Sequence, residues 1–349
     1  MYTSAAMRTL VVSDLHLGGR LGRDVLRRPA PLEALLGALD GVDRLVLLGD
    51  VVELAEGRPA EAMEAAEPVL RPLGARMGAA REVIVVPGNH DAALVRPFLR
   101  ARGMSPALDA SLPLDATPLL ARTASFLAPA RVRVHYPGIW LSERVWATHG
   151  HYLDRHLLPE VAYGIARGLL GRVPRDDATP VEYEQPGGPS LTRLEALLTR
   201  WLPRPLAALA EDAAELLRAA SMPGVPRGLL GHRIAPLNAA LLGLQMRRAS
   251  IPALARVVHR LGVEAESVIF GHVHRLGPLA GDDLRRWRGP DGTPPHLQHR
   301  RLGLRAAAAA PRARAAPLLA RGAVVVEAGE APRATGLLDH LEAAALSGP

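Results

Sequence analysis

The chain has 349 residues, 48% of them hydrophobic, which is enough for one large α/β domain or for a core domain with an insert. It contains no cysteine, and this excludes disulfides, thiolate metal sites and cysteine nucleophiles and is compatible with a cytoplasmic protein. Aromatic residues make up only 3%, which argues against a stacking platform for single-stranded nucleic acid.

The formal net charge of +7 comes from arginine alone, because the sequence has no lysine. Five of the arginines lie in the stretch 292–320, which has no acidic residue, and without them the charge would be +2. This near balance does not favour nucleic acid as a partner. No run of about 18 apolar residues is present, so we expect no transmembrane segment, although peripheral contact with a membrane stays open. Residues 1–6 lack the features of a signal peptide, so we expect a cytoplasmic protein, with its oligomeric state left open.

Short β-rich runs alternate with helical patterns along the chain. Four to six apolar residues bounded by Gly, Asp or Asn are typical of buried strands. Strands that alternate with helices indicate an α/β fold, whose ligands lie beyond the carboxyl ends of the strands. We predict strands at 9–13, 45–48, 83–86, 145–148 and 268–270, and helices between them such as 31–39 and 60–77.

The stretch 151–262 has a different character. Leucines at helical spacing mark amphipathic helices near 191–201, 206–217 and 254–261, and Pro- and Gly-rich joints separate them. We predict a helical insert here, between core segments 7–150 and 263–340, with helices packed on one another rather than on a membrane. We expect this insert to roof one side of the active site and to select the substrate.

A polar cluster follows each expected strand. Histidine, carboxylate and amide ligands suit Mn, Fe, Zn, Ni or Co better than Ca or Mg. Two such cations would acidify a bridging water and clamp phosphoryl oxygens. Each cluster is a weak or moderate signal alone, but five at strand ends in one chain are not explained by chance. The clusters are Asp14-Leu15-His16, Gly49-Asp50, Gly88-Asn89-His90-Asp91, His149-Gly150-His151 and Gly271-His272-Val273-His274.

In this order the five clusters resemble the signature of the calcineurin-like metallophosphoesterase superfamily, from residue 7 to about residue 275. The resemblance implies a four-layer αββα sandwich and a hydrolase with two divalent transition metal ions and a metal-bridging hydroxide as nucleophile. It implies one metal held by Asp14, His16, Asp50 and His274. It implies a second metal held by Asp50, Asn89, His149 and His272, with Asp50 bridging. His90 would act on the scissile phosphate as general acid or transition-state donor, oriented by Asp91.

The substrate class stays open among phosphomonoesters, phosphodiesters and pyrophosphates. The start Ser-Asp-Leu-His-Leu is similar to that of lipid-sugar diphosphatases, so an amphiphilic phosphorylated substrate is one alternative. A nuclease of the same superfamily is another, but it needs a basic groove. A non-catalytic binding protein is the third, although all seven ligand residues are present. Arg20 and Arg23 could grip phosphate.

Four residues near the clusters are not part of the implied ligand set. His151 could support the ligands, face the substrate or be exposed. Asp154 and His156 are expected in a solvated loop. Glu53, three residues after Asp50, is expected to be a carboxylate at the start of a helix.

The segment 292–320 has no apolar periodicity and is of low complexity. One explanation is a natural disordered insert. The other is a pair of compensating frameshifts, because reading one base into the codons of residues 297–303 permits Phe-Asn-Thr-Gly-Gly-Trp-Val, close to a strand of the resembled superfamily. We expect no strand in this segment, an unfilled sheet edge beside 268–270, and a hairpin formed by 323–327 and 334–338.

Overall fold

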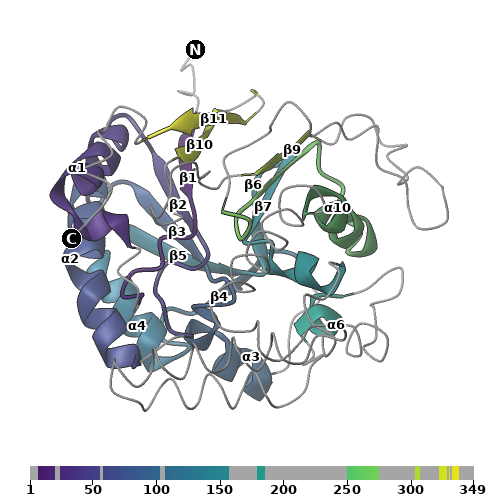
Figure 1. The fold of residues 1–349 in the computed structure, drawn as a ribbon, viewed down its shortest axis with the longest axis horizontal. Helices are drawn as coiled ribbons and strands as arrows, with labels where there is room; N and C mark the ends of the chain where they lie inside the picture. Colours follow the sequence, from purple (N-terminus) through teal and green to yellow (C-terminus); the bar gives the residue numbers. More distant parts are fainter. Residues whose placement is uncertain are drawn as a thin grey trace, which may run out of the picture.

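Two β-sheets pack face to face between two helical layers, in the αββα order that the family resemblance implies (Figure 1). The computed structural model describes residues 7–19, 24–55, 58–102, 107–156, 179–184, 250–274, 303–306, 322–327, 330 and 332–337. Arg20 and Arg23, and the helices predicted at 191–201 and 206–217, lie outside the described residues.

The larger sheet has seven strands, and its four central strands are parallel. The three others add antiparallel at the two edges, and the predicted C-terminal hairpin is among them. In spatial order the strands are β11 (Arg333–Gly336), β10 (Gly322–Glu327), β1 (Arg8–Val12), β2 (Arg44–Leu48), β3 (Glu82–Val86), β5 (Arg131–Tyr136) and β4 (Ala110–Leu112).

Helices cover the outer face of this sheet because its strands are apolar on both sides. In β1, for example, Leu10 and Val12 pack toward the helices, while Val11 packs toward the second sheet. Three of these helices begin with a proline, at a position where the missing N–H leaves no bond unmade. The helical elements of this half are η1 (Val25–Arg27), α1 (Pro29–Ala38), α2 (Pro59–Met77), η2 (Ala92–Leu94), α3 (Arg96–Arg102) and α4 (Pro118–Phe126).

The smaller sheet has the order β6-β7-β8-β9, and α10 covers its outer face, on the side opposite α1 and α2 (Figure 1). Trp146, Val268 and Phe270 pack into this outer cluster, together with η3 and α6. The bounds are β6 (Gly138–Ser142), β7 (Val145–Thr148), η3 (His151–His156), α6 (Pro180–Glu184), α10 (Ser250–Arg260), β8 (Ser267–Phe270) and β9 (Gly303–Ala306).

Strand β9 corrects the prediction that 292–320 forms no strand and leaves the sheet edge unfilled. Gly303–Ala306 pairs in parallel with β8, from Ser267↔Gly303 to Phe270↔Ala306. The ladder uses only backbone N–H and C=O groups, and the open edge of β8 offers a row of them to any short extended segment. The rest of 292–320 lies outside the described residues, and the frameshift stays a prediction that resequencing the coding DNA would test.

Of the predicted insert 151–262, the described elements are η3, α6 and α10, and α10 covers most of the helix predicted at 254–261. The insert as a whole stays a prediction. No helix in the described part of the chain has the length and apolar character needed to cross a membrane.

Candidate metal centre

The five polar clusters follow the carboxyl ends of β1, β2, β3, β7 and β8. Strands β1, β2 and β3 are mutually parallel, and so are β7 and β8, so within each sheet the clusters emerge at the same edge. Backbone hydrogen bonds join the loops: the Asp14 N–H donates to the Gly49 carbonyl at 3.0 Å, and the Gly271 N–H donates to the His149 carbonyl at 3.0 Å. The two sheets contribute to a single site, because the His272 N–H in turn donates to Asp14 Oδ1 at 3.0 Å.

Backbone strain is concentrated in these loops. Left-handed conformations at non-glycine residues store about 1–3 kcal/mol each and are held only where the surrounding structure requires them. Every non-glycine residue with positive φ in the described part of the chain is a predicted ligand: Asp14 (57°), His16 (45°), Asp50 (53°), His272 (69°) and His274 (47°). This pattern is typical of a functional site.

The glycines of the clusters permit close approach. A Cβ added at Gly88 would clash with Asp50 Oδ1 and with the His149 ring. At Gly49, where φ is +83°, a Cβ would clash with the same ring. Glycine at these two turns is what lets the His149 side chain lie against the loops of the larger sheet.

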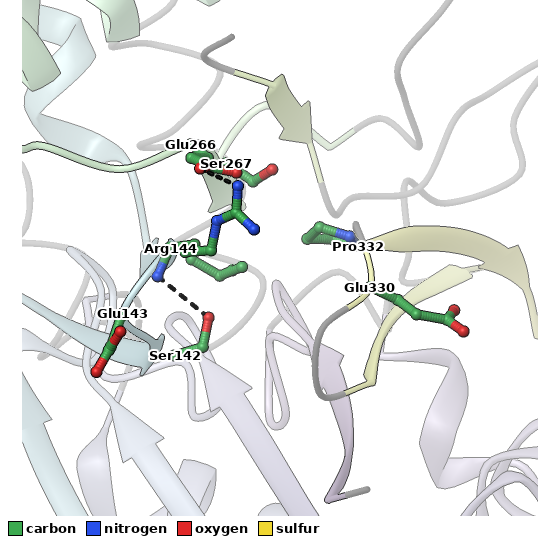
Figure 2. A pocket seen from close by; sticks show the side chains of 8 residues that line it. Ser142, Glu143, Arg144, Glu266, Ser267, Glu330 and Pro332 are labelled. Carbon is green, nitrogen blue, oxygen red and sulfur yellow. Dashed lines mark hydrogen bonds and ion pairs between the residues drawn. The ribbon is translucent and has the colours of Figure 1, made fainter. Parts of the chain in front are cut away.

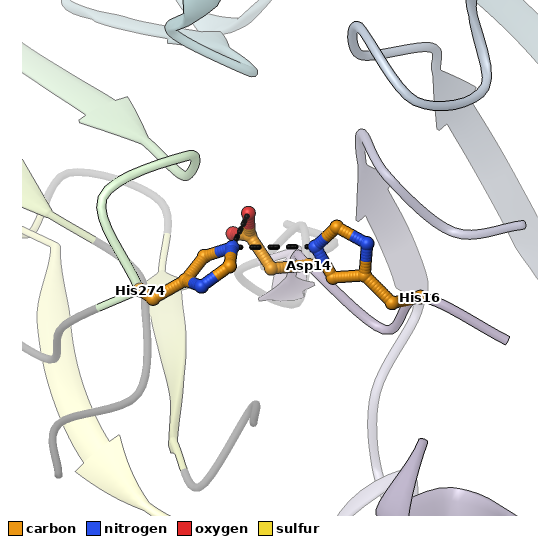
Figure 3. A group of neighbouring side chains, drawn as sticks. All are labelled: Asp14, His16 and His274. Atoms are coloured by element: carbon orange, nitrogen blue, oxygen red, sulfur yellow. Dashed lines mark hydrogen bonds and ion pairs between the residues drawn. The ribbon is translucent and has the colours of Figure 1, made fainter. Parts of the chain in front are cut away.

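One group of donors comprises Asp14, His16 and His274, whose ligand atoms lie within 4.8 Å of one another (Figure 3). His274 Nε2 lies 3.3 Å from Asp14 Oδ1 and 3.2 Å from His16 Nε2. His16 Nδ1 lies 2.8 Å from a Glu53 carboxylate oxygen, so Nδ1 carries the proton and the lone pair of Nε2 faces His274. Two imidazole nitrogens and a carboxylate facing one another are a donor set that suits a divalent cation.

A second group forms around His149, which is fully buried. His149 Nδ1 lies 3.0 Å from the Leu48 carbonyl and therefore donates to it. His149 Nε2 lies 3.1 Å from Asn89 Oδ1 and 3.1 Å from Asp50 Oδ2. His272 belongs to the same group, with its ring centroid 5.3 Å from that of His149. This set combines imidazole, carboxylate and amide oxygen.

Asp50 belongs to the group of His149 and His272 and also lies near His16 of the first group. Its Oδ2 lies 3.1 Å from His149 Nε2 and 3.8 Å from His16 Nε2. Its Oδ1 accepts the His90 backbone N–H at 2.8 Å, which fixes the carboxylate between the two sides. The structure therefore brings all seven predicted ligand residues together, with the Asp50 carboxylate near histidines of both groups.

The electrostatic field of the site favours positive charge. Burial alone would raise the pKa of Asp14, but the hydrogen bond and charge of His274 lower it to about 2. Burial alone would lower the pKa of His149, but the charge of Asp50 raises it to about 10. A cation bound between these groups would take the place of the proton on His149. The residues present therefore fit a divalent metal.

Glu53 is a functional residue that sequence reasoning misplaced. It is buried, and its carboxylate lies 2.8 Å from His16 Nδ1 and 2.8 Å from His90 Nδ1. Burial alone would raise the pKa of Glu53, but the hydrogen bonds from the two imidazoles lower it to about 2. The prediction of a carboxylate at a helix start is wrong, because Glu53 lies in the loop after β2 and orients two histidines of the site.

Asp91 has a different role from the one predicted. Its buried carboxylate accepts backbone N–H groups of Gly88 (2.6 Å), Val51 (2.7 Å) and Asp50 (3.3 Å). Burial and the charge of Asp50 raise the pKa of Asp91 to about 6. The prediction that Asp91 orients His90 is wrong: the buried amides of two turns need an acceptor, and Asp91 supplies it. The carboxylate at His90 Nδ1 is that of Glu53.

The structure also places three residues that follow His149 in the sequence, namely His151, Asp154 and His156. His151 is only 11% exposed, and its Nε2 lies 3.4 Å from Glu184 Oε1. Asp154 and His156 do not form a solvated loop but belong to η3. Asp154 Oδ1 lies 2.8 Å from His272 Nε2.

Replacing Glu53 by glutamine is expected to lower turnover roughly 10–100-fold, the usual effect of losing an outer partner of a metal-ligating histidine. A glutamine has one acceptor oxygen in place of two, so either His16 or His90 loses its orienting partner. Steady-state kinetics and metal titration would check this, with the exposed Glu33→Gln on α1 as control. Wild-type turnover and metal affinity in Glu53→Gln would show that Glu53 is only structural.

Comparison with protein families gives one match: residues 7–176 match the family described as calcineurin-like phosphoesterase. No curated protein matches the sequence. Among solved structures, a mutant of a cold-active protein tyrosine phosphatase is 14% identical, with 78% of this chain and 68% of that chain covered. Its TM-score is 0.22, too low to support an inference.

The family match spans four of the five polar clusters, through His149-Gly150-His151. The fifth cluster lies beyond the matched residues, and its two histidines complete the donor groups that the matched clusters begin. Residues 7–176, just under half of the chain, are therefore similar to the calcineurin-like phosphoesterase family.

Proposed function

We propose that the protein is a two-metal hydrolase of phosphate esters or anhydrides. The observation that carries the proposal is the position of Asp50, whose Oδ2 lies between His16 Nε2 (3.8 Å) and His149 Nε2 (3.1 Å). A single carboxylate at this place would serve two cations at once. The family supports a hydrolase, and the donor groups support divalent metal binding.

Each side of Asp50 would hold one cation. The first would be held by Asp14, His16, Asp50 and His274, and the second by Asp50, Asn89, His149 and His272. When bound, divalent ions of the Mn, Fe, Zn, Ni or Co type supply an acidified water and positive charge for the phosphoryl oxygens. The tautomers of His16 and His149 are already set by Glu53 and by the Leu48 carbonyl, so little reorganisation is needed.

His90 is the group suited to act on the leaving oxygen. Its side chain is 28% exposed, whereas the predicted ligands Asp50 and His149 are almost completely buried. With Nδ1 bonded to Glu53, Nε2 is the nitrogen that would donate a proton to a substrate oxygen. The carboxylate of Glu53 stabilises the charged imidazole, as in other acid–base pairs of carboxylate and histidine.

The proposed substrate carries a phosphoryl group. The residues that border the site determine which other chemical groups it can carry. We infer a small phosphorylated molecule, with an amphiphilic one as the narrower alternative. Figure 2 shows a pocket lined by Ser142, Glu143, Arg144, Val145, Glu266, Ser267, Glu330 and Pro332. This pocket does not contribute, because its residues lie at the amino-terminal ends of β7 and β8, opposite the polar clusters.

Hydrolysis of p-nitrophenyl phosphate and bis-p-nitrophenyl phosphate would test this function. Protein stripped with a chelator should be inactive, and added Mn²⁺ should restore hydrolysis of at least one ester. The preferred ester distinguishes a monoesterase from a diesterase, and a nuclease would also cleave DNA or RNA. A chain that binds two cations but hydrolyses no ester, pyrophosphate or nucleic acid would be a binding protein, and the proposal would be wrong.

A further inference from the structure

Asp154 contacts one of the predicted ligands directly. Its Oδ1 lies 2.8 Å from His272 Nε2. A carboxylate at this distance accepts the Nε2 proton, which leaves Nδ1 of His272 as the nitrogen with a free lone pair. An acceptor that fixes the tautomer of a metal-ligating histidine also fixes the orientation of its ring.

The reach of Asp154 depends on the backbone of η3. Its side chain is 47% exposed, and a half-exposed ion pair contributes little unless its partners are held in place. A six-residue 3₁₀ helix has no stability of its own, so η3 must be positioned by its neighbours. Tyr152 and Leu153 are buried in the cluster that includes α10, and this holds one side of η3.

Helix α6 holds η3 through Tyr183 and Glu184. The rings of Tyr152 and Tyr183 stack at a centroid distance of 4.9 Å and an angle of 11°. Arg155 Nη2 donates to the Tyr183 carbonyl at 3.1 Å, and His156 Nε2 lies 2.9 Å from the Tyr183 hydroxyl. These partners lie on both sides of Asp154 in the sequence of η3. Tyr183 itself is buried.

We propose that α6, which lies in the predicted insert, sets the cation affinity of the group that includes His272, through η3 and Asp154. Asp154 is thus a positioning residue, and Tyr183 is the residue of α6 that keeps it in reach of His272. The inference rests on the proposed metal centre. It assigns to the insert a role in metal binding that is independent of any contact with substrate.

A double-mutant cycle with Mn²⁺ as the probe, measured by calorimetric titration of the full chain without substrate, tests the inference. Asp154→Ala should weaken one of the two binding events by roughly 10–100-fold and leave the other unchanged. Tyr183→Ala should weaken the same event by a smaller factor. The double variant should bind as Asp154→Ala does, since both changes remove one interaction. Asp115→Asn, exposed and remote, and Glu182→Gln, exposed on α6, are matched controls and should bind as wild type does.

Other results would overturn the inference. Independent, additive losses would show that α6 does not act through Asp154, and unchanged binding in Asp154→Ala would remove Asp154 from the centre. If Tyr183→Ala fails to fold, Tyr183→Phe takes its place, because it keeps the stacking and loses only the hydroxyl. This variant must then weaken the same Mn²⁺ binding event that Asp154→Ala weakens. Wild-type protein that binds no Mn²⁺ would overturn the proposed function together with this inference. If wild-type protein binds two Mn²⁺ ions and these variants bind both with unchanged affinity, this inference would be wrong while the proposed function would stand.

Discussion

Replacing Asp50 by alanine is expected to remove binding of both cations and reduce hydrolysis to background. The carboxylate is almost completely buried, and its Oδ2 faces His16 on one side and His149 on the other. Alanine leaves each donor group without its shared oxygen. It also leaves the buried Nε2 of His149 without the carboxylate that raises its pKa. Metal content after dialysis, measured by elemental analysis, and turnover of p-nitrophenyl phosphate would check both losses.

Two further variants isolate the bridging role of Asp50. Asp50→Asn keeps an oxygen for the His90 backbone N–H and should fold normally, yet it loses the charge shared by the two sites. Asn89→Ala removes a donor from the second group only, so it should retain one cation. If Asp50→Ala retained one cation with wild-type affinity, the carboxylate would serve a single site and the two-metal function would be wrong.

Much of the site could be predicted because it depends on backbone rules that are visible in the sequence. Apolar runs that end in Asp, Asn or His mark the carboxyl ends of buried strands, and in parallel sheets these ends share an edge. Gly49 and Gly88 indicate turns where other chain segments come close, and the structure places the His149 ring against both. The resemblance of the ordered clusters to the calcineurin-like superfamily then implied how the seven donors are grouped.

The orienting carboxylates could not be assigned in this way. Glu53 has the spacing of an ordinary carboxylate after a turn, and only the approach of the loops after β1 and β3 brings His16 and His90 to it. Asp91 is adjacent to His90 in sequence, but its side chain points toward the buried amides of the β2 and β3 turns. Asp154 is exposed and polar, and its contact with His272 spans 118 residues of sequence. Such contacts depend on tertiary structure, which sequence spacing does not encode.

Strand β9 shows a different limit of structure prediction from sequence patterns. Its sequence has none of the alternation that predicts a strand, yet its backbone pairs with β8. Pattern-based prediction detects side chains that fill a core, whereas an edge strand needs only backbone groups facing an open ladder. The C-terminal hairpin, by contrast, has buried Ala323 and Val324 in the core of the larger sheet, and the apolar run predicted it.

Replacing His90 by alanine is expected to separate metal binding from chemistry. The backbone N–H of residue 90 donates to Asp50 Oδ1, and any residue at this position keeps that bond, so the shared carboxylate should stay in place. The ring is instead held by Glu53 through Nδ1. Turnover should fall by roughly 10²–10⁴, the usual contribution of a positioned proton donor, with two cations still bound.

A comparison of esters with different leaving groups tests the role of His90 more specifically than turnover of one ester does. A general acid matters most when the departing oxygen is basic, so the loss in His90→Ala should be larger for an alkyl phosphate than for p-nitrophenyl phosphate, whose leaving group needs little protonation. An equal loss on both esters would indicate a hydrogen-bond donor to the transition state rather than an acid. Because the ring also lies within 4.8 Å of donor atoms of His16 and Asp50, loss of a cation in His90→Ala would identify it as a ligand instead. Unchanged turnover of both esters would exclude His90 from the reaction.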